Sequence, residues 1–389
     1  MGIHPGIEEH AEEIKEIFRD LHAHPEIGFE ERRTSGIVAE RLREYGVDEV
    51  HTGIGETGVV GIIRGGGQGN RCIGLRADMD ALPIHEATDL PYASKNDGVM
   101  HACGHDGHTS MLLGAARHLS RTRDFDGTAM LVFQPAEEGL GGARSMLAEG
   151  LFERHPCDEI YGIHNFPSGE AGKVRICKGR AMAGASFFDI RVGGRGSHAA
   201  MPQMSRDSLV AASALVGELQ TIVSRNVTPT DTCVLSVTTF HSGSAYNVIP
   251  GSAELSGTIR YFDDAVVELA ESRMRDICEG ISQSHGVDVG LDLRNVFDVL
   301  INDPDLSDAY LKAAADVVGV ENVAETKIPV TGSEDFADML KVVPGAYCVL
   351  GHSCRVPLHN PGFVLDPEII PVGASILSRI VETRLPLQN

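Results

Sequence analysis

Histidine, cysteine and carboxylate side chains gather in one short segment, residues 101–108 (HACGHDGH). These residue types are the ligands that zinc and other transition metals prefer in proteins. Cys103 and His105 are two positions apart, so in an extended segment both side chains point to the same side. Any single histidine here is more often a packing residue. For the cluster as a whole, the pattern favours a metal site.

Three further segments carry candidate ligands, and each stands at the end of an apolar, β-rich run. In α/β sheets, binding sites form beyond the carboxyl ends of the strands, so these segments are expected to converge. The segments are RADMDALP (76–83) with Asp78 and Asp80, QPAEEG (134–139) with Glu137 and Glu138, and GIHN (162–165) with His164.

The adjacent carboxylates Glu137 and Glu138 cannot point in one direction on a regular element. We therefore expect a division of labour, in which one binds metal and the other acts as general base toward a water molecule. A Glu-Glu pair is usually a solvated surface, but the apolar run before this pair argues against that interpretation. A last candidate ligand is His359, in the Pro/Gly-rich loop PLHNPG (357–362).

A nucleotide-binding pattern is also present, since residues 53–58 (GIGETG) match GxGxxG and Asp78 follows twenty residues later. A dinucleotide site needs a strand before the glycines and a helix after them. The residues that follow, 59–63 (VVGII), have the pattern of a strand. We therefore reject a nicotinamide cofactor and interpret the segment as a glycine turn between two elements.

Composition excludes several classes of function. The chain has 389 residues, and 55 acidic against 33 basic side chains give a net charge of −22, which disfavours nucleic acid as a partner. No apolar stretch approaches the ~20 residues of a membrane helix, and the first ten residues lack a signal-peptide pattern. The eight cysteines include no CxxC pair, which indicates reduced thiols and a cytoplasmic protein.

Two parts of the chain have an α/β pattern that must position these residues. Strands alternate with helices in the first part, which predicts a mostly parallel sheet, and the same style resumes near the C-terminus. Predicted strands are 59–63, 72–77, 129–133, 160–163 and 346–350; predicted helices are 8–21, 30–45, 108–121, 142–149, 307–318, 333–341 and 368–383.

The middle of the chain has a different order. It reads strand 186–192, helix 207–224, strands 232–241 and 253–262, helix 263–285 and strand 287–296, which is the split β-α-β ferredoxin-like arrangement. We predict a catalytic metal-binding domain of residues 1–181 and 296–389, interrupted by a smaller α+β domain of residues 182–295. Such an insertion is required if His359 joins ligands that precede residue 165.

A set of ordered motifs resembles a known superfamily. The motifs are ADMDALP, MHACGHDGHT, QPAEEG, GIHN, GRGSHAAMP, NVIPG, GTIRYF, GSEDF and LHNPGF. Together they are similar to the dinuclear metal-dependent aminoacylase and carboxypeptidase superfamily. Within it, they resemble the amidohydrolase branch of hippurate hydrolases, indole-acetyl-amino-acid hydrolases and N-acyl-amino-acid deacylases. The likeness extends from residue 21 to the C-terminal helix.

The resemblance implies a role for individual residues. Glu137 matches the catalytic base, and Asp80 resembles a carboxylate that orients a ligand. Most of the superfamily has a carboxylate at the position of Cys103 and a histidine at that of Asp78, so this chain has the pattern of its own branch. The residues that match the ligands of the two metal ions are Cys103, His105, Glu138, His164 and His359.

The resemblance also implies that the inserted domain is a lid and dimerisation domain. His198 matches a histidine that stabilises the oxyanion in the active site of the neighbouring subunit, which implies a homodimer or a higher oligomer. Asn247 and Arg260 resemble residues that bind substrate, with Arg260 suited to an α-carboxylate. A surface salt bridge is an equal interpretation for Arg260. Residues 333–335 resemble a segment near the pocket, and helix capping by Ser333 is an equal interpretation.

The implied function is hydrolysis of the amide bond in N-acyl amino acids, which yields a carboxylic acid and a free amino acid. The implied cofactors are two divalent ions per subunit, Zn or Mn, with Co or Ni as alternatives. Other functions stay open: a dipeptidase or carboxypeptidase of the same superfamily, or a non-catalytic metal-dependent binding protein. The sequence does not specify the acyl group or the amino acid.

Overall fold

The computed structural model describes residues 2–387, and the chain divides into two compact units. Unit 1 comprises Met1–Ala181, Ile301–Pro329 and Asp335–Asn389, and unit 2 comprises Met182–Leu300 and Val330–Glu334. Unit 2 is thus an insertion that ends five residues beyond the predicted boundary at 295. It also takes in the short segment 330–334, which the sequence analysis had assigned to the larger domain.

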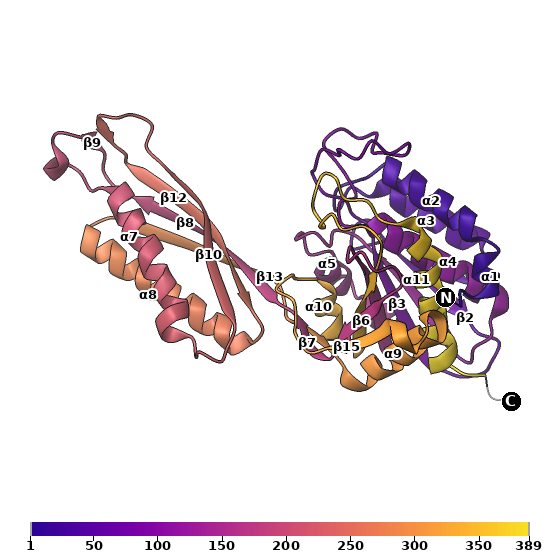
Figure 1. The fold of residues 1–389 in the computed structure, drawn as a ribbon. Coiled ribbons are helices and arrows are strands. Elements are labelled where there is room, and N and C mark those ends of the chain that lie inside the picture. The colour runs from indigo at the N-terminus through magenta and orange to yellow at the C-terminus, as the bar shows by residue number, and fades with distance from the viewer. Residues whose placement is uncertain (1, 388–389) are drawn as a thin grey trace. The chain divides into compact units, whose positions relative to one another are not determined.

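An eight-stranded sheet forms the framework of unit 1 (Figure 1), in the order β1-β2-β4-β3-β5-β16-β6-β15. The central strands β4, β3, β5 and β16 pair in parallel, whereas β1, β2 and β6 add antiparallel pairs, so the sheet is mixed. The strands are β1 (Glu49–Ile54), β2 (Gly58–Arg64), β3 (Cys72–Asp78), β4 (Thr128–Gln134), β5 (Glu159–Phe166), β6 (Val174–Cys177), β15 (Val323–Thr326) and β16 (Gly345–Gly351).

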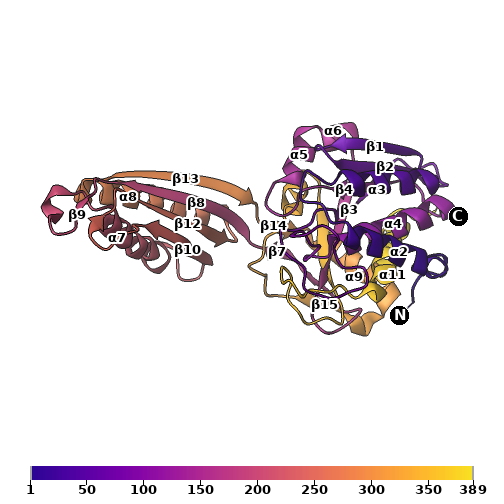
Figure 2. The ribbon, with the colours of Figure 1, turned by 90° about the horizontal axis from the view of Figure 1, so that it is seen from above.

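Helices cover both faces of this sheet. Helices α3, α4, α9 and α11 contact its strands, α2 packs on α4, and α5 with α10 lies beside β4. Figure 2 shows α3 beside the hairpin formed by β1 and β2. The helices are α1 (Pro5–Glu8), α2 (Ala11–Ala23), α3 (Arg32–Glu44), α4 (His105–Thr122), α5 (Gly142–Ala148), α6 (Leu151–Arg154), α9 (Pro304–Val318), α10 (Phe336–Leu340) and α11 (Ile370–Arg384).

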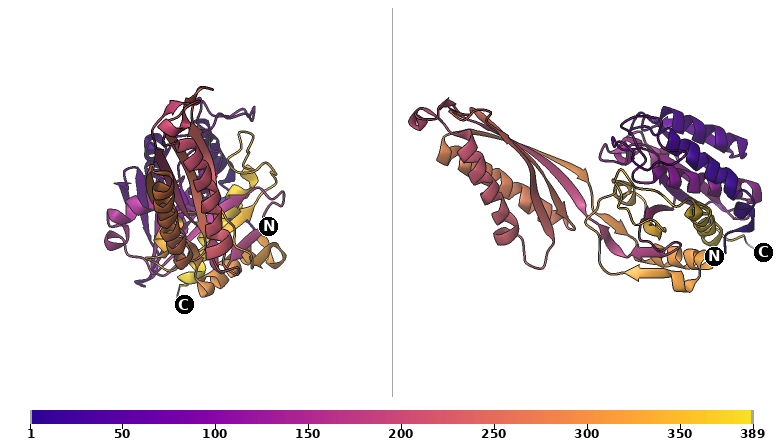
Figure 3. Two further views of the ribbon diagram at one scale, coloured as in Figure 1. Left: turned by 90° about the vertical axis from the view of Figure 1, so that its left-hand side faces the viewer. Right: turned by 45° about the horizontal axis from the view of Figure 1, so that its top comes forward.

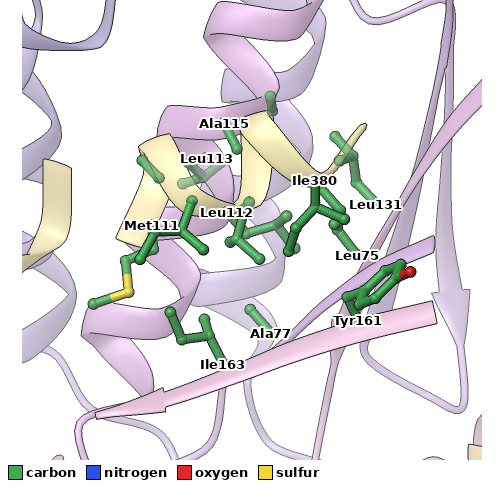
Figure 4. Packing of buried hydrophobic residues seen from close by; sticks show 14 of the residues in the cluster. Leu75, Ala77, Met111, Leu112, Leu113, Ala115, Leu131, Tyr161, Ile163 and Ile380 are labelled. Carbon is green, nitrogen blue, oxygen red and sulfur yellow. The ribbon is translucent and has the colours of Figure 1, made fainter. Parts of the chain in front are cut away.

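The core of unit 1 lies between the central strands and helix α4. Strand β3 is buried along its whole length and carries Leu75 and Ala77, while the apolar face of α4 supplies Met111, Leu112 and Leu113. Figure 4 shows these side chains packed together. Burial on both faces explains why the central strands are continuous apolar runs without alternation.

Unit 2 is built on a four-stranded antiparallel sheet of order β10-β12-β8-β13. Helices α7 and α8 lie side by side against it and share its core (Figure 3). With the chain order β8-α7-β10-β12-α8-β13, this is a ferredoxin-like fold. Its elements are β8 (Gly184–Gly193), α7 (Ser208–Thr221), β10 (Cys233–Ser242), β12 (Ser252–Tyr261), α8 (Asp264–His285) and β13 (Asp288–Phe297).

The predicted fold class, an α/β domain with a smaller α+β insertion, is confirmed. The sequence analysis missed β1, β6 and β15, which lack a continuous apolar run. Most residues of β1 and β15 are half-buried or exposed, and only every second residue of the four-residue β6 is buried. It also began α4 three residues late, because the helix starts at His105, inside the predicted metal cluster.

Two further features of the described chain bear on function. All eight cysteines are free thiols. Among residues 2–387, no helix combines the length and the apolar character needed to cross a membrane.

Candidate metal centre

The predicted ligands of unit 1 come from four places at one edge of its sheet. Cys103 lies in the turn before α4 and His105 is the first residue of that helix, while His164 lies in β5. Glu138 follows β4, and His359 belongs to the loop between β16 and α11. Parallel central strands end at the same edge of a sheet, which is why segments distant in sequence meet here.

The candidate ligand atoms of these residues lie close to one another. Cys103 Sγ lies 3.4 Å from His164 Nε2, and Glu138 Oε1 lies 3.2 Å from His359 Nε2. In each of three groups, the ligand atoms all lie within 4.8 Å of one another. The groups are Cys103-His105-His164, Cys103-Glu138-His359 and His105-Glu137-Glu138. Cys103 and His105 each occur in two groups, which suits two adjacent ions.

Hydrogen bonds on the far side of two histidines determine which nitrogen faces the centre. His105 Nδ1 donates to Asp80 Oδ1 at 3.0 Å, and His164 Nδ1 donates to the carbonyl of Asn165 at 2.6 Å. In each ring, Nε2 is therefore the nitrogen that would present its lone pair to a metal ion. His105 Nε2 is buried and has no hydrogen-bond partner among the described residues. Such an orphaned atom is costly unless a ligand fills the site, so this donor set fits divalent metal ions.

The electrostatic field of the centre also favours cations. Hydrogen bonds with Cys103 and then Glu138 raise the pKa of His359 to about 10, because both side chains accept from, and so stabilise, a positive ring. Burial and the neighbouring His108 hold the pKa of His164 well below its usual range, so this ring is neutral. A centre that stabilises positive charge and contains neutral imidazole nitrogens is suited to a metal cation.

Asp80 joins two of the ligands. Its Oδ1 accepts the bond from His105, and its Oδ2 accepts the backbone N–H of Glu138 at 2.9 Å. The carboxylate is buried, so these bonds are not exposed to competition from solvent. Asp80 thus orients a histidine and fixes the start of a ligand-bearing loop, as carboxylates next to metal ligands commonly do.

Two candidates from the sequence clusters have other tasks. His108 donates from Nδ1 to Asp78 Oδ1 at 2.6 Å, and its Nε2 accepts the backbone N–H of Asn165 at 2.9 Å. Both ring nitrogens are occupied, so His108 braces β3 against β5. Asp78 is also paired with the buried Arg76, at 2.8 Å. His101 is buried, and neither of its ring nitrogens has a hydrogen-bond partner among the described residues.

Sequence reasoning missed a buried network beneath the loop 134–139. Arg76 Nη2 donates to Asp335 Oδ1 at 3.1 Å, and Gln134 Nε2 donates to the same oxygen at 2.7 Å. Asp335 Oδ2 accepts the backbone N–H of Ala143 at 3.0 Å. Asp335 therefore ties β3, β4 and α5 together. The only sequence signal was its place in the motif GSEDF.

The capping interpretation of Ser333 is wrong. Helix α10 begins after Asp335 and has no side-chain cap. Ser333 belongs to unit 2, where its hydroxyl accepts a hydrogen bond from Arg260 Nη1 at 2.9 Å.

The other predicted residues of unit 2 lie on or beside its strands. His198 lies in β9 (Ser197–His198), which pairs with β11 (Val248–Ile249), and its Nδ1 accepts the backbone N–H of Ala200 at 3.1 Å. The Asn247 carbonyl accepts the backbone N–H of Ala199 at 3.0 Å, so Asn247 and His198 share one ribbon. Both are exposed, and the Nε2–H of His198 is its donor group.

Arg260 lies near the opposite end of the sheet of unit 2. Its guanidinium lies over the ring of Phe187, 5.7 Å from the centroid, and burial lowers its pKa. No carboxylate forms an ion pair with it among residues 2–387, so it is not the surface salt bridge considered above. On β12, Ser252 pairs with the end of β8 that leads to β9, and Arg260 is eight residues further along. At ~3.3 Å per residue, about 26 Å separates the two ends.

Comparison with known proteins adds sequence and structural evidence. The family model described as peptidase family M20/M25/M40 matches residues 74–383. Hippurate hydrolase from Campylobacter jejuni is 40% identical over 98% of this chain and 98% of its own. Thermostable carboxypeptidase 1 from Saccharolobus solfataricus is 39% identical over 93% of this chain and 92% of its own.

A solved structure extends the likeness to the fold. It is the dinuclear metal-binding peptidase of the M20 family from Bacillus subtilis, with 32% identity and a TM-score of 0.82. The alignment covers 97% of this chain and 99% of that one.

Proposed function

This chain belongs to peptidase family M20/M25/M40, and we propose that it is a metal-dependent amidohydrolase of N-acyl amino acids. It cleaves the amide bond and yields a carboxylic acid and a free amino acid. The observation that carries this proposal is the buried carboxylate of Glu137, adjacent to the ligand set, in a chain similar over its whole length to a hippurate hydrolase.

Two divalent ions fit the donor set of Cys103, His105, Glu138, His164 and His359. When bound, they polarise the substrate carbonyl and make a water molecule acidic enough to act as nucleophile near neutral pH. The thiolate and imidazole donors favour Zn, whereas the carboxylate is equally suited to Mn, with Co or Ni as further occupants.

Glu137 is the residue that moves the proton. Its carboxylate accepts a proton from the attacking water and later donates it to the leaving amine. One carboxylate thus acts first as general base and then as general acid. Glu138, the adjacent residue, has its backbone N–H bound to Asp80 and its Oε1 beside His359. The neighbouring carboxylates thus have different partners and separate roles.

His198 supplies a hydrogen-bond donor for the oxyanion, from a neighbouring subunit. About 26 Å of β-strand separates Arg260 from the end of the sheet that leads to His198, which is longer than an N-acyl amino acid. One copy of unit 2 therefore cannot present both residues to one small substrate. A homodimer, in which each site takes one of these residues from each copy, removes the conflict.

Arg260 binds the α-carboxylate of the substrate, and Asn247 contributes an amide beside His198. The guanidinium of Arg260 is half-buried and has only a neutral partner, Ser333, as its described hydrogen-bond acceptor. A desolvated arginine without an anionic partner is suited to binding a carboxylate.

Free thiols throughout the chain agree with a reducing cytoplasmic location.

A substrate panel tests the reaction class. The purified protein, reconstituted separately with Zn, Mn, Co and Ni, is incubated with N-acetyl and N-benzoyl amino acids and with dipeptides, and released amine is measured. We expect N-acyl amino acids to be cleaved faster. Preference for dipeptides would favour the carboxypeptidase alternative, which the Saccharolobus relative supports. Metal-dependent binding of every substrate without any hydrolysis would favour a binding protein.

A mixed dimer tests the role of His198 across subunits. Variants Glu137→Ala and His198→Ala are each expected to retain metal and lose turnover. A verified heterodimer contains one site in which both residues are intact, so it should recover up to half of the activity per dimer. Verified heterodimers as inactive as the parents would overturn the cross-subunit assignment.

A further inference from the structure

The loop that carries Glu137 and Glu138 begins with a strained residue. Ala136 has φ of 53°, in the left-handed region that residues with a Cβ rarely adopt. Such backbone persists only where the surroundings hold it, and it commonly occurs next to reacting groups. The question is therefore which residues hold Ala136.

A buried carboxylate from a distant part of the chain holds its backbone. Glu31, the residue before α3, accepts the N–H of Ala136 on Oε1 at 2.8 Å. Its Oε2 accepts the hydroxyl of Thr57 at 2.6 Å. Glu31 is fully buried and Thr57 is 6% exposed, so solvent cannot easily replace either bond. The two bonds form a continuous link from Thr57 through Glu31 to Ala136.

Thr57 belongs to the turn between β1 and β2, the segment with the GxGxxG pattern, and the structure continues from it as a strand, where a dinucleotide site needs a helix. Gly55 has φ of 64°, and a Cβ there would lie 2.7 Å from Met146 Cγ in α5. A Cβ on Gly58 would lie 3.2 Å from Cδ of Pro135, the residue before Ala136, and would also collide with the carbonyl of Ile54. The glycines let this turn pack closely against the loop that begins at Gln134.

We propose that Thr57 and Glu31 are positioning residues for Glu137. The hairpin turn places the Thr57 hydroxyl, the hydroxyl orients the Glu31 carboxylate, and the carboxylate holds Ala136 in the conformation that directs Glu137 toward the ligand set. Neither residue is expected to touch the substrate. This inference rests on the proposed function for its kinetic readout but not for its structural one.

Thr57→Val is the decisive variant, because it removes the hydroxyl and keeps the side-chain shape. Displacing a reacting group by about 1 Å can cost on the order of 100-fold in rate. We therefore expect kcat to fall at least tenfold with KM changed less than threefold and two metal ions retained. Thr57→Ser, which restores a hydroxyl, should recover most of kcat. In a crystal structure of Thr57→Val, Ala136 should leave its φ of 53°.

Thr34→Val is the matched control. Thr34 is a buried threonine whose hydroxyl also donates to a glutamate, Glu26, at 3.0 Å, but it lies in α3 and has no bond to the loop 134–139. It should lower stability as Thr57→Val does and leave kcat unchanged. Glu31→Ala removes both bonds, so its loss of kcat should be at least as large as that of Thr57→Val at equal metal content.

Three outcomes decide the matter. An unchanged kcat in Thr57→Val, or equal losses of kcat in Thr57→Val and Thr34→Val, would overturn the positioning role. A Thr57→Val structure with Ala136 unmoved would overturn it as well, whatever the activity. If the unmodified protein hydrolyses no N-acyl amino acid, the proposed function fails, and the crystal structure still tests whether Thr57 and Glu31 hold Ala136.

Discussion

Glu137 and Glu138 have identical side chains in different surroundings, which suits the different roles proposed for them. The backbone N–H of Glu138 is bound to Asp80 and its carboxylate lies beside His359, which agrees with its proposed role as a ligand. Glu137 is buried next to His105 and follows the strained Ala136. Two such carboxylates can divide metal binding from proton transfer.

At this scale, Glu137→Ala tests the assignment of the base. We expect turnover to fall by at least 10³-fold, because no other carboxylate is proposed to move the proton. Two metal ions should still bind, since the ligand set is intact. Metal content by elemental analysis and initial rates are measured on the same sample. Near-normal rates, or loss of both ions, would contradict the assignment.

The charge of the buried His22 ring depends on two carboxylates beside it. Its Nδ1 lies 2.6 Å from Asp106 Oδ2 and its Nε2 lies 3.3 Å from Glu86 Oε1. Burial alone would lower the pKa of His22, but the carboxylates of Asp106 and Glu86 outweigh it and raise the pKa to about 9. The protonated ring therefore joins α2 to α4 at neutral pH.

A raised pKa in the folded state predicts how stability varies with pH. The contribution of His22 is fully present below its unfolded pKa of 6.5 and is lost as the pH rises through about 9. We expect this contribution to the free energy of unfolding to be of order 1–3 kcal/mol. The free energy of unfolding is measured with urea at pH 6.5 and pH 9, for the unmodified protein and for His22→Gln, both freed of metal with a chelator. Equal slopes with pH in both proteins would contradict the prediction.

The candidate site residues that stand in dense motifs could be predicted from the sequence. The residues that position them through hydrogen bonds could not. Cys103, His105 and Glu137 stand in dense motifs with recognisable chemistry. Glu31, Thr57 and Asp335 are ordinary residues until the fold brings them to their partners. The partners Arg76 and Asp335, for example, are 259 positions apart. No local pattern records a hydrogen bond over such a separation.

At the scale of elements, the start of α4 determines the position of two proposed ligands. Gly104, between Cys103 and His105, has φ of 88°, and a Cβ there would collide with Asn165 Nδ2. That amide donates to the carbonyl of Cys103 at 2.6 Å. The helix can thus begin at His105 only because the turn before it fits closely against β5.

Gly104→Ala should therefore weaken metal binding more than it weakens the fold. We expect the metal affinity to fall roughly 10- to 100-fold, the usual effect of disturbing the support of a ligand. Gly46→Ala is the control, since Gly46 also has positive φ, 79°, with nothing within 4 Å of an added Cβ. Competition with a chelator measures both. An equal loss of affinity in the two variants would show that strain alone is responsible.

The accuracy of the predicted elements follows burial. Strands such as β3 and β4 are buried along almost their whole length and were recognised as apolar runs. Buried and more exposed residues alternate along β8, and this pattern in the sequence helped to identify unit 2. Strands β1 and β15 are short and partly exposed, and only pairing with neighbours distinguishes them from loops.

At the scale of the whole molecule, chemistry and charge are unevenly distributed. All five proposed metal ligands lie in unit 1, and each unit has its own hydrophobic core. The net charge of −22 disfavours nucleic acid as a partner, but it does not argue against the anionic substrate proposed above, because bound cations and a positive side chain can attract an anion locally. Local charge outweighs the total there.

Removal of metal should consequently destabilise one unit. A ligand that binds only the folded state adds about 3 kcal/mol at a concentration of 100 Kd, and this is lost on chelation. Hydrogen exchange with and without chelator should show faster exchange in the core of unit 1 and little change in α7 and α8 of unit 2. Equal acceleration in both units would contradict this prediction.

The central claim is that this chain hydrolyses N-acyl amino acids at a two-metal centre. The most direct measurement is a titration of the metal-free protein with Zn or Mn, in which bound metal and the release of amino acid from an N-acyl substrate are followed together. We predict activity that reaches its maximum at two equivalents per chain, with one carboxylic acid formed for each amino acid. Full activity in the presence of excess chelator, or a maximum at one equivalent, would contradict the account.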